Sequence, residues 1–581
     1  MIKDKIKQLI ASALAKLKIT ESDIVVEYPL HSEFGDYATN IALKLSKTHK
    51  KSPITLAEEI VAAIPSSPLI AHMEVASPGF INFTLHTSIL IHYLDEVKLK
   101  ETQFGHTDTL QKKKVMIEYT DPNPFKEFHI GHLYSNIVGE SLARLYEAIG
   151  AHVERACYQG DVGLHVAKSL WGMQHFMKTE SMDVAHLESL PLEERVKFMG
   201  KAYAYGAKMY EENEDAKLAM HELNKKIYDH DASIYDLYKT GRTWSLEYFN
   251  TIYKKLGTTF NHHFFESEVG DEGIKYVKDN LKKGIFKESK GAIVFEGEQY
   301  GLHTRVFINS LGLPTYEAKD LALAPTKYNT FAYDVSIIVT GNEINDYFKV
   351  VLKALELINP SLRAKTVHLS HGMVRLPEGK MSSRSGNIIT GEWLIGEATE
   401  KAWDIIKKTT KTQLSTDGNN HDHGQHVLAE KVALAAIRYA LLKNTIGKNV
   451  EFDFNESISF DGNSGPYLQY TYVRCMSVLQ KQISPETMMS TYVPNEEETA
   501  LLRYIPKFEE IILAAALNNA PNLISTFLYE FAALFNLFYQ KHSILNTSDE
   551  TKTFRLKLTA AVAQILKNGL YLLGIETVEK M

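Results

Sequence analysis

A strand–loop–helix–strand pattern constrains the fold of this chain more than any other feature of its sequence. Val115–Tyr119 has the apolar run of a buried strand, and Ala151–Tyr158 repeats that pattern. The loop after the first strand contains Pro122 and Pro124, and apolar residues then recur at helical spacing over residues 133–149. Two strands joined through a helix in this order form one unit of a parallel sheet. The sequence therefore predicts an α/β sheet domain that binds ligands at the carboxyl ends of its strands.

Further strands and a long helical stretch follow this unit. We expect the same sheet to resume at Ala292–Phe295, Arg305–Asn309 and Val335–Thr340, where apolar runs return. The residues before them are mostly charged and have helical periodicity, as in Glu193–Asp229. They predict helical insertions into the sheet domain.

The chain is long enough for several domains, because 581 residues exceed the roughly 100–200 residues of a typical domain. The N-terminal part has an amphipathic helix from residue 2 to residue 17, strand-like runs at Ile24–Glu27 and Ile81–Leu85, and a polar linker at Thr102–Thr109. From Ala429 onward the pattern is helical. The predicted fold is multidomain α/β, with an N-terminal α+β domain over residues 1–105, a Rossmann-like parallel-sheet domain with helical insertions over residues 106–410, and a C-terminal α-helical bundle over residues 411–581.

Composition excludes several classes of protein. The formal net charge of −7 argues against a protein that coats nucleic acid without specificity, although local patches can still hold an RNA. Cys157 and Cys475 are too few for a disulfide framework or a Cys-rich zinc site, so no structural metal is expected. Met1–Thr20 lacks the apolar core of a signal peptide, and no apolar run is long enough to span a membrane. We expect a cytoplasmic monomer without a membrane partner.

A His-x-Gly-His motif follows the first strand of the predicted sheet. His129 and His132 open the helix, where unpaired backbone N–H groups favour a phosphate. Gly131 has no side chain, so a flat base can approach the backbone. Both histidines can donate hydrogen bonds to a phosphate whose negative charge grows during displacement. By itself, the motif also fits two surface histidines at a helix start.

A second segment, Gly379–Asn387, is basic and rich in hydroxyl groups. Lys380 is a mobile positive charge suited to a triphosphate, and the glycines at either end would let the loop close. Read alone, the segment is more typical of a solvated turn. Its place after the last strand of the predicted sheet pairs it with the histidine motif.

Together, the two segments resemble the paired signatures of class I aminoacyl-tRNA synthetases. The surrounding residues are similar to the arginyl-tRNA synthetase version of that family, from Glu118–Asn123 before the histidines to Lys567–Ile575 near the end of the chain. The resemblance runs from about residue 30 to the last residue. Further matching stretches lie in all three predicted domains: Phe34–Asn40, Pro78–Phe83, Gly160–Gly163, Gly312–Asp320 and Gly465–Tyr470.

The resemblance implies that the protein ligates L-arginine to its cognate tRNA, tRNA(Arg), in two steps with ATP and Mg²⁺. The arginine carboxylate attacks the α-phosphate, which gives arginyl-adenylate and pyrophosphate. The terminal ribose of the tRNA then takes the arginyl group, first on its 2′-hydroxyl, and AMP is released. In this family the first step usually requires bound tRNA.

The family's site residues transfer to matching positions of this chain. His129, His132 and Lys380 would act on the reacting phosphates. Tyr316 and Asp320, which share one face if their stretch is helical, would hold the guanidinium. Asp320 is also open to a second reading, a helix-surface acid paired with Lys319 or Lys327. The full sets implied are His129, Gly131, His132, Lys380, Met381 and Ser382 for ATP, and Glu118, Asn123, Tyr316, Asp320 and Glu343 for arginine.

For tRNA, the resemblance implies contacts from both flanking domains. Phe80 and Asn82 would meet the D-loop, Tyr467 and Tyr470 would stack on anticodon bases, and Met581 would lie near the anticodon. Core packing is the competing interpretation of Phe80 and of the two tyrosines.

The sequence departs from the family pattern at a few positions. The basic loop reads Lys-Met-Ser-Ser-Arg384, without the second lysine of the usual signature. Val162 stands where a tryptophan is usual, and Tyr134 where an arginine is common. Asn342–Glu343 and Asp346 stand where the family tends to carry Gln and His, and Glu343 would add negative charge near a cationic substrate.

Three other readings compete with this one. A class I synthetase for cysteine would need a zinc site, which two distant cysteines do not supply, and one for glutamate would need a basic site where Glu118 and Asp320 bring negative charge. A catalytically silent RNA-binding relative would not need the two histidines and Lys380. A small nucleotidyltransferase with the same histidine motif would not need the helical C-terminal domain.

Overall fold

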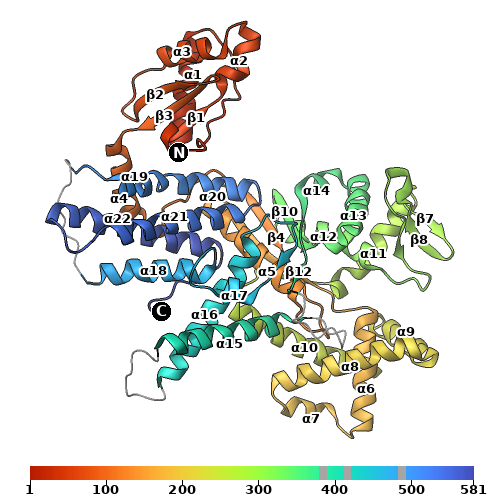
Figure 1. Ribbon diagram of the computed structural model, residues 1–581. Helices are drawn as coiled ribbons and strands as arrows, with labels where there is room; N and C mark the ends of the chain where they lie inside the picture. The colour runs from red at the N-terminus through yellow and green to blue at the C-terminus, as the bar shows by residue number, and fades with distance from the viewer. Residues whose placement is uncertain (378–388, 411–419, 482–491) are drawn as a thin grey trace.

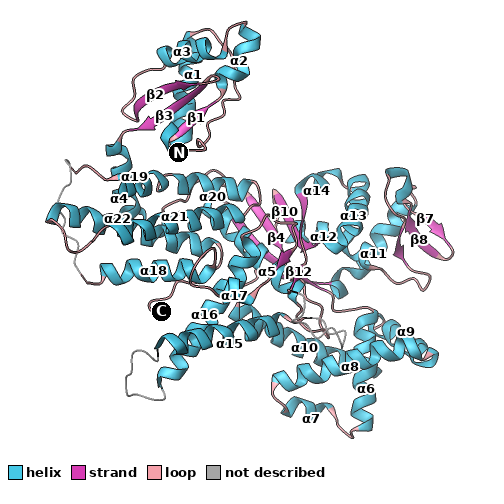
Figure 2. Ribbon diagram, viewed as in Figure 1, coloured by secondary structure: helices cyan, strands magenta, loops and turns pink. Residues whose placement is uncertain are grey.

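The computed structural model describes residues 1–377, 389–410, 420–481 and 492–581. A central sheet domain adjoins a helical bundle, and one helix links that bundle to a small N-terminal unit (Figure 1). Strands are confined to the centre, the N-terminal unit and one edge of the molecule, and helices form the rest (Figure 2). Within the described residues, no helix has both the length and the apolar character that crossing a membrane requires.

The central sheet has five parallel strands in the order β11-β10-β4-β5-β6. β4 is the first of them in the chain, yet it lies between β5 and β10, so the strand order reverses at the β4–β10 pair. The crossover connections leave this pair in opposite directions, which opens a crevice at the carboxyl ends of the strands. The predicted Rossmann-like parallel sheet is confirmed. Its strands are β4 Lys114–Glu118, β5 His152–Gln159, β6 His262–Phe265, β10 Val335–Gly341 and β11 Thr366–His371.

Helix α5 (Ile130–Ala148) crosses from β4 to β5 and is buried along most of its length. It lies between the sheet and the C-terminal bundle. Ser135 Oγ donates to the Val339 carbonyl of β10 at 2.8 Å, and Ser141 Oγ donates to the Leu572 carbonyl of the bundle at 2.9 Å. α5 therefore fixes the carboxyl end of β4 relative to both domains.

Five helices form an insertion between β5 and β6, as the sequence predicts. They enclose a second hydrophobic core, which also takes in Phe125 from the loop after β4. α6 and α8 approach closely at Gly172 and Gly206, where an added Cβ would meet a backbone carbonyl of the other helix. The helices are α6 Leu164–Thr179, α7 Val184–Ser189, α8 Leu192–Glu212, α9 Glu214–Tyr228 and α10 Ala232–Lys255.

Two segments expected in the parallel sheet belong to another sheet. β8 (Ala292–Phe295) and β9 (Arg305–Ile308) pair antiparallel, with β7 (Lys287–Ser289) beside β8. The expectation that the parallel sheet resumes there is wrong, because a short apolar run does not reveal its partner strand. The turn at Lys290 and Gly291, both at positive φ, instead closes a β7–β8 hairpin. The helices around this small sheet and β10 are α11 Glu266–Leu281, α12 Tyr316–Thr330, α13 Asn345–Ile358 and α14 Pro360–Lys365.

The N-terminal unit is a three-stranded antiparallel sheet in the order β1-β3-β2, covered by helices. The strand expected at Ile24–Glu27 is wrong, because the described backbone there forms only an isolated bridge between Glu27 and Ala38. Helix α4 (Thr87–Lys100) leaves the unit and packs on α22 (Asp549–Leu572). The other elements are α1 Ile2–Lys16, β1 Tyr37–Thr39, α2 Ile41–His49, α3 Pro53–Ala63, β2 Ile70–Ala76 and β3 Phe80–Leu85.

The C-terminal part is helical, as the sequence predicts, and its core is continuous with the core around α5. Two short parallel strands, β12 (Val374–Arg375) and β13 (Val450–Glu451), join it to the sheet domain. Its helices besides α22 are α15 Gly391–Thr410, α16 Asn420–Leu442, α17 Phe454–Ser457, α18 Gly465–Leu479, α19 Glu496–Tyr504, α20 Lys507–Leu517 and α21 Asn522–Lys541.

Candidate active site

The loop between β4 and α5 holds its backbone in an unusual conformation. Thr120, Asp121 and Phe125 have φ of 82°, 45° and 67°, in the left-handed region that residues other than glycine rarely adopt. Neighbouring side chains enforce this shape. The Thr120 N–H donates to Ser135 Oγ at 2.9 Å, and the Phe125 N–H donates to Ser245 Oγ at 3.0 Å. Backbone strain that the surroundings impose in this way concentrates at functional sites.

His129 and His132 cap the start of α5 reciprocally. His129 Nδ1 accepts the N–H of Gly131 at 3.1 Å and of His132 at 3.3 Å, and His132 Nδ1 accepts the His129 N–H at 3.3 Å. The two rings stack with centroids 3.4 Å apart. Because Nδ1 accepts in both rings, each neutral imidazole carries its proton on Nε2 and can donate it to a ligand.

Both histidines are neutral at physiological pH. Burial, and then the charge of Lys126, lowers the pKa of His129 to about 4. Burial, and then His129, holds the pKa of His132 well below its usual value. The pair can therefore donate hydrogen bonds to a phosphate without adding positive charge. The prediction that these histidines open a helix at the carboxyl end of a parallel strand is confirmed.

The segment that follows the basic loop lies against the histidine motif. The Ile130 N–H donates to the Ile389 carbonyl at 2.9 Å, and the Gly391 N–H donates to the Phe128 carbonyl at 2.8 Å. The residues predicted for ATP in the loop itself, Lys380, Met381 and Ser382, lie outside the described residues, and their roles stay predictions.

Carboxyl groups gather beside the strained loop. Glu118, at the end of β4, is buried and pairs with Lys327 of α12 at 2.5 Å, so its charge is matched within the protein. Asp121 accepts the Tyr158 N–H at 2.7 Å. Burial, and then the charge of Glu118, raises the pKa of Asp121 well above its usual value. This effect of Glu118 on Asp121 shows that the two acidic groups share one poorly solvated region.

Asp320 has no lysine partner among the described residues. Its Oδ2 accepts the Tyr347 hydroxyl at 2.5 Å, while Lys319 and Lys327 pair with other carboxylates. The reading of Asp320 as a surface acid paired with one of those lysines is therefore wrong. Burial first, and then neighbouring carboxylates, raise its pKa to about 7 against the lowering effect of the Tyr347 hydroxyl. A carboxyl group in this state gains from the arrival of a cation.

Tyr316 and Asp320 lie one turn apart on α12, as the sequence predicts. Tyr316 is the first residue of the helix, and 49% of its surface is exposed. The ammonium of Lys319 lies 4.6 Å from the centre of its ring, and the same ammonium forms a buried ion pair with Glu266. Tyr316 is thus a half-exposed aromatic side chain that already contacts one cation, beside the buried carboxyl groups.

The two remaining residues predicted for arginine lie after β4 and after β10, at the crevice between these strands. The side-chain oxygen of Asn123 packs against Gly160, where a Cβ would collide with it. Glu343 is exposed in the short 3-10 turn η4 (Asn342–Ile344), which directly follows β10. The charge of Glu343 acts to raise the pKa of His129, so the two groups are within electrostatic reach.

The residues predicted to contact tRNA lie in the two flanking domains. Phe80 begins β3 and is 37% exposed, whereas Asn82 on the same strand is buried. Tyr467 is partly buried, and its hydroxyl accepts a hydrogen bond inside the bundle, whereas Tyr470 is 38% exposed. Met581 packs against the bundle core. Packing therefore explains Asn82 and Tyr467, and only Phe80 and Tyr470 of this set offer open aromatic surface.

Several residues of the site carry no sequence signal. Lys327 and Tyr347 come from helices far along the chain, and only the fold brings them to Glu118 and Asp320. Asp121 does carry one, because it stands between a buried strand and two prolines in the stretch that leads to the histidines.

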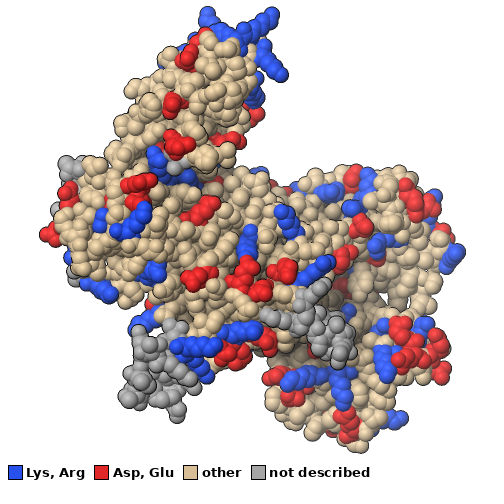
Figure 3. Space-filling model, in the orientation of Figure 1, with Lys and Arg blue, Asp and Glu red and all other residues tan. Residues whose placement is uncertain are grey.

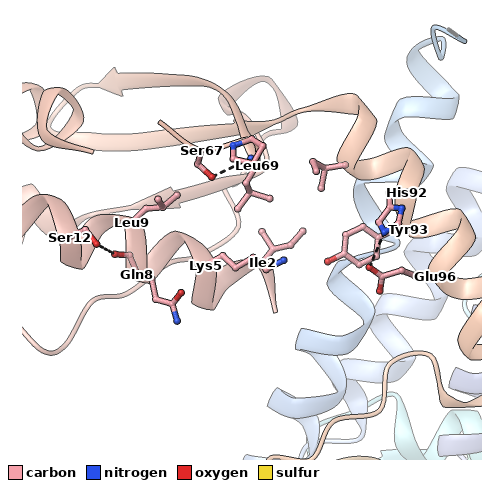
Figure 4. A pocket seen from close by; sticks show the side chains of 12 residues that line it. Ile2, Lys5, Gln8, Leu9, Ser12, Ser67, Leu69, His92, Tyr93 and Glu96 are labelled. Atoms are coloured by element: carbon pink, nitrogen blue, oxygen red, sulfur yellow. Dashed lines mark hydrogen bonds and ion pairs between the residues drawn. The ribbon is translucent and has the colours of Figure 1, made fainter. Parts of the chain in front are cut away.

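A cavity of about 560 Å³ lies outside this crevice, between α1 and α4 (Figure 4). Its lining mixes apolar side chains such as Leu9 with scattered charged ones such as Lys5 and Glu96, which do not converge on one point. Within the described ranges, no three His, Cys, Asp or Glu side chains are grouped to hold a metal ion. Chemistry rather than volume therefore identifies the β4–β10 crevice as the candidate active site.

Comparisons with known protein families cover nearly the whole chain. The family described as "tRNA synthetases class I (R), catalytic domain" matches residues 94–454. The "Arginyl tRNA synthetase N terminal domain" matches residues 4–85, and the "DALR anticodon binding domain" matches residues 468–581.

Curated relatives and solved structures agree with these matches. The chain is 31% identical to an arginine–tRNA ligase of Borreliella afzelii, over 100% of this chain and 99% of the relative, and 30% identical to one of Clostridium perfringens, over 99% and 100%. Arginyl-tRNA synthetase of Thermus thermophilus superposes with a TM-score of 0.81 at 23% identity, over 100% of both chains. The enzyme of Plasmodium falciparum superposes with a TM-score of 0.79 at 21% identity, over 100% and 99%. These two structures establish the overall fold.

Proposed function

The chain belongs to the arginyl-tRNA synthetase family of class I enzymes, and from that membership we propose how its residues divide the reaction. The protein is an arginine–tRNA ligase. One observation carries the assignment of the site: a cluster in which carboxyl groups outnumber lysines lies with two neutral phosphate donors at the reversal point of the sheet. The cluster sets four carboxyl groups, Glu118, Asp121, Glu266 and Asp320, against two lysines, Lys319 and Lys327.

Asp320 and Tyr316 form the guanidinium site. A guanidinium presents a planar fork of N–H donors, and a carboxylate is the acceptor that matches it with two parallel hydrogen bonds. The Asp320 carboxyl is oriented by Tyr347 and has no lysine partner among the described residues. The half-exposed ring of Tyr316, one turn away, gives the flat cation a surface to stack on beside Lys319. Glu118 acts on this pair only indirectly, because its own charge is matched by Lys327.

Asn123 and Glu343 hold the other end of the amino acid. Asn123 lies within the strained loop, between Asp121 and Phe125, so its amide is positioned to bind the α-amino or α-carboxylate group. Glu343 adds negative charge after β10, which favours a substrate with two positive groups.

ATP binds at the start of α5. His129 and His132 donate through Nε2 to the phosphates, and Gly131 leaves the backbone open to the nucleotide. We assign Lys380, with Met381 and Ser382, to the departing pyrophosphate, where a mobile ammonium neutralises growing charge. Mg²⁺ enters with the triphosphate as part of the substrate.

No side-chain nucleophile is required. In the first step an oxygen of the arginine carboxylate forms a bond to the α-phosphorus, and the bond to the pyrophosphate oxygen breaks. In the second step a terminal ribose hydroxyl of the tRNA attacks the arginyl carbonyl carbon. The bond from that carbon to the bridging oxygen breaks, and AMP leaves with this oxygen. The protein contributes position and electrostatic stabilisation, which supply most of the rate in phosphoryl transfer.

The flanking domains bind tRNA(Arg). Residues 1–105 reach the D-loop through Phe80, with Asn82 supporting the strand, and residues 411–581 meet the anticodon with Tyr470, near Tyr467 and Met581. Basic and acidic side chains are interspersed on the face shown in Figure 3. We assign base contacts to aromatic stacking at a few points, Phe80 and Tyr470. We place the enzyme in the cytoplasm as a monomer, and its free buried cysteines, Cys157 and Cys475, suit a reducing compartment.

Pyrophosphate exchange tests the proposal. With ATP, arginine and labelled pyrophosphate, the wild-type protein should form labelled ATP only when tRNA(Arg) is present. Asp320→Asn should raise the KM for arginine at least tenfold and leave the KM for ATP within about twofold, because only the guanidinium contact is lost. An Asp320→Asn variant with an unchanged KM for arginine would move the guanidinium site elsewhere.

A further inference from the structure

Helix α10 of the insertion contacts the loop that leads to the histidine motif. Ser245 Oγ accepts the Phe125 N–H at 3.0 Å and donates to the Gly241 carbonyl at 2.8 Å. Gly241 also faces the Phe125 ring, which would block a Cβ at that position. The strained loop after β4 is thus seated on one face of α10.

Tyr248 lies three residues after Ser245 on the same helix, and therefore on the same face. Its hydroxyl donates to the carboxylate of Glu392 in the first turn of α15. The backbone N–H of Phe128, next to His129, is near enough to this hydroxyl to act on its pKa, in the lowering direction. One buried side chain therefore bonds the helix that follows the basic loop and lies beside the start of the histidine motif.

The segments that Tyr248 joins are also paired through their backbones, between Ile130 and Ile389 and between Phe128 and Gly391. These bonds fix the distance between the two backbone segments. They do not themselves join α15 to α10. Apolar packing brings the two helices together, and the Tyr248–Glu392 bond adds a specific polar constraint, since it ties a side chain of α15 to the insertion.

We propose that Tyr248 is a positioning residue for the first step of the reaction, which holds the histidine motif and the segment Ile389–Glu392 in fixed register through its hydroxyl. It touches neither substrate. Its effect reaches ATP through His129. The inference rests on the proposed role of the histidine motif in binding ATP.

Removing the hydroxyl should change ATP use far more than arginine use. A hydrogen bond to a charged group corresponds to about a tenfold to hundredfold effect when its loss is felt in the transition state. Tyr248→Phe should therefore lower kcat/KM for ATP in tRNA-dependent pyrophosphate exchange about tenfold to hundredfold. The KM for arginine should stay within about twofold, because Asp320 and Tyr316 lie on α12, outside the segments that Tyr248 joins.

Glu392 variants test whether the effect runs through this bond. Glu392→Ala should match Tyr248→Phe, and Glu392→Gln should stay within about threefold of wild type, because the amide oxygen still accepts the hydroxyl proton. The double variant Tyr248→Phe/Glu392→Ala should be no worse than either single change. Tyr235→Phe on the same helix is the matched control, since no described residue accepts a hydrogen bond from its hydroxyl, and it should behave as wild type.

Three results would overturn the positioning role: multiplying effects in the double variant, equal losses for arginine and ATP, or a Tyr248→Phe enzyme with wild-type kinetics. A fall in thermal unfolding temperature that parallels the activity loss in every variant would also overturn it, because it indicates general destabilisation. His129→Ala separates this inference from the proposed ATP site. If neither Tyr248→Phe nor His129→Ala changes the kinetics, the ATP site itself is misassigned. If His129→Ala lowers the activity and Tyr248→Phe does not, only the role of Tyr248 is refuted.

Discussion

Arginine binding should release a proton from Asp320. In the free protein, burial and neighbouring carboxylates raise the pKa of this carboxyl to about 7. A guanidinium favours the ionised carboxylate, so binding requires the proton to leave. Below pH 7 that proton must be expelled at a cost in free energy, and above pH 7 it is already gone. The affinity for arginine should therefore rise as the pH rises from 6 to 8.

The size of the effect follows from the pKa. With a pKa of about 7, the apparent dissociation constant scales as one plus the ratio of protonated to ionised carboxyl, which is about 11 at pH 6 and about 1.1 at pH 8. Arginine should thus bind about tenfold more tightly at pH 8, a difference of about 1.4 kcal/mol. At pH 7 about half a proton should leave for each arginine bound.

Isothermal titration calorimetry measures both quantities, since titrations in buffers of different ionisation enthalpy give the number of protons released. Asp320→Asn should bind arginine weakly at every pH and release no proton. His129 and His368 have pKa values lowered to about 4 by burial, so neither titrates in this range. Asp121→Asn is the second control, because the pKa of Asp121 is also raised. An affinity that stays constant from pH 6 to pH 8, or a slope that survives Asp320→Asn, would refute the reasoning.

Three further changes test the fold and the site. Lys327→Met should lower the free energy of unfolding by roughly 3–5 kcal/mol in guanidinium chloride, because it leaves the Glu118 charge buried and unpaired. The double variant Lys327→Met/Glu118→Gln should recover most of that loss, and no recovery would argue against the ion pair. Gly206→Ala should lower the melting temperature, because its Cβ meets a backbone carbonyl of α6, whereas Gly396→Ala, with no neighbour within 4 Å, should not. His129→Ala should lower kcat of pyrophosphate exchange about a hundredfold, and a change under threefold would contradict its role as a phosphate donor.

The elements that could be predicted are those whose signal is contiguous in the chain. β4, α5 and β5 follow one another directly, so the change from an apolar run to helical spacing reveals the unit. β6 (His262–Phe265) reads His-His-Phe-Phe and β11 contains two histidines, so neither has the apolar run of a central strand. Both lie at edges of the sheet, where one side lacks a neighbour and polar residues are tolerated.

The same difference between local signals and long-range pairing applies to the site. His129 and His132 are recognisable because their spacing and the strand before them are local. The pairing of Glu118 with Lys327 and of Asp320 with Tyr347 joins segments far apart in the chain, and the sequence offers several lysines for each acid. Only the packing of α12 and α13 against the sheet selects the partner. That selection leaves Asp320, rather than Glu118, as the acid without a lysine.

Aminoacylation of unfractionated tRNA, with each of the twenty amino acids and with citrulline supplied separately, tests the arginine assignment most directly. Citrulline has nearly the shape of arginine but a neutral urea group in place of the guanidinium, so a site built on the Asp320 carboxylate should reject it. We predict that arginine alone is charged, with citrulline at least a thousandfold poorer in kcat/KM. Charging of another amino acid, or of citrulline at a rate near that of arginine, would contradict the guanidinium site described above.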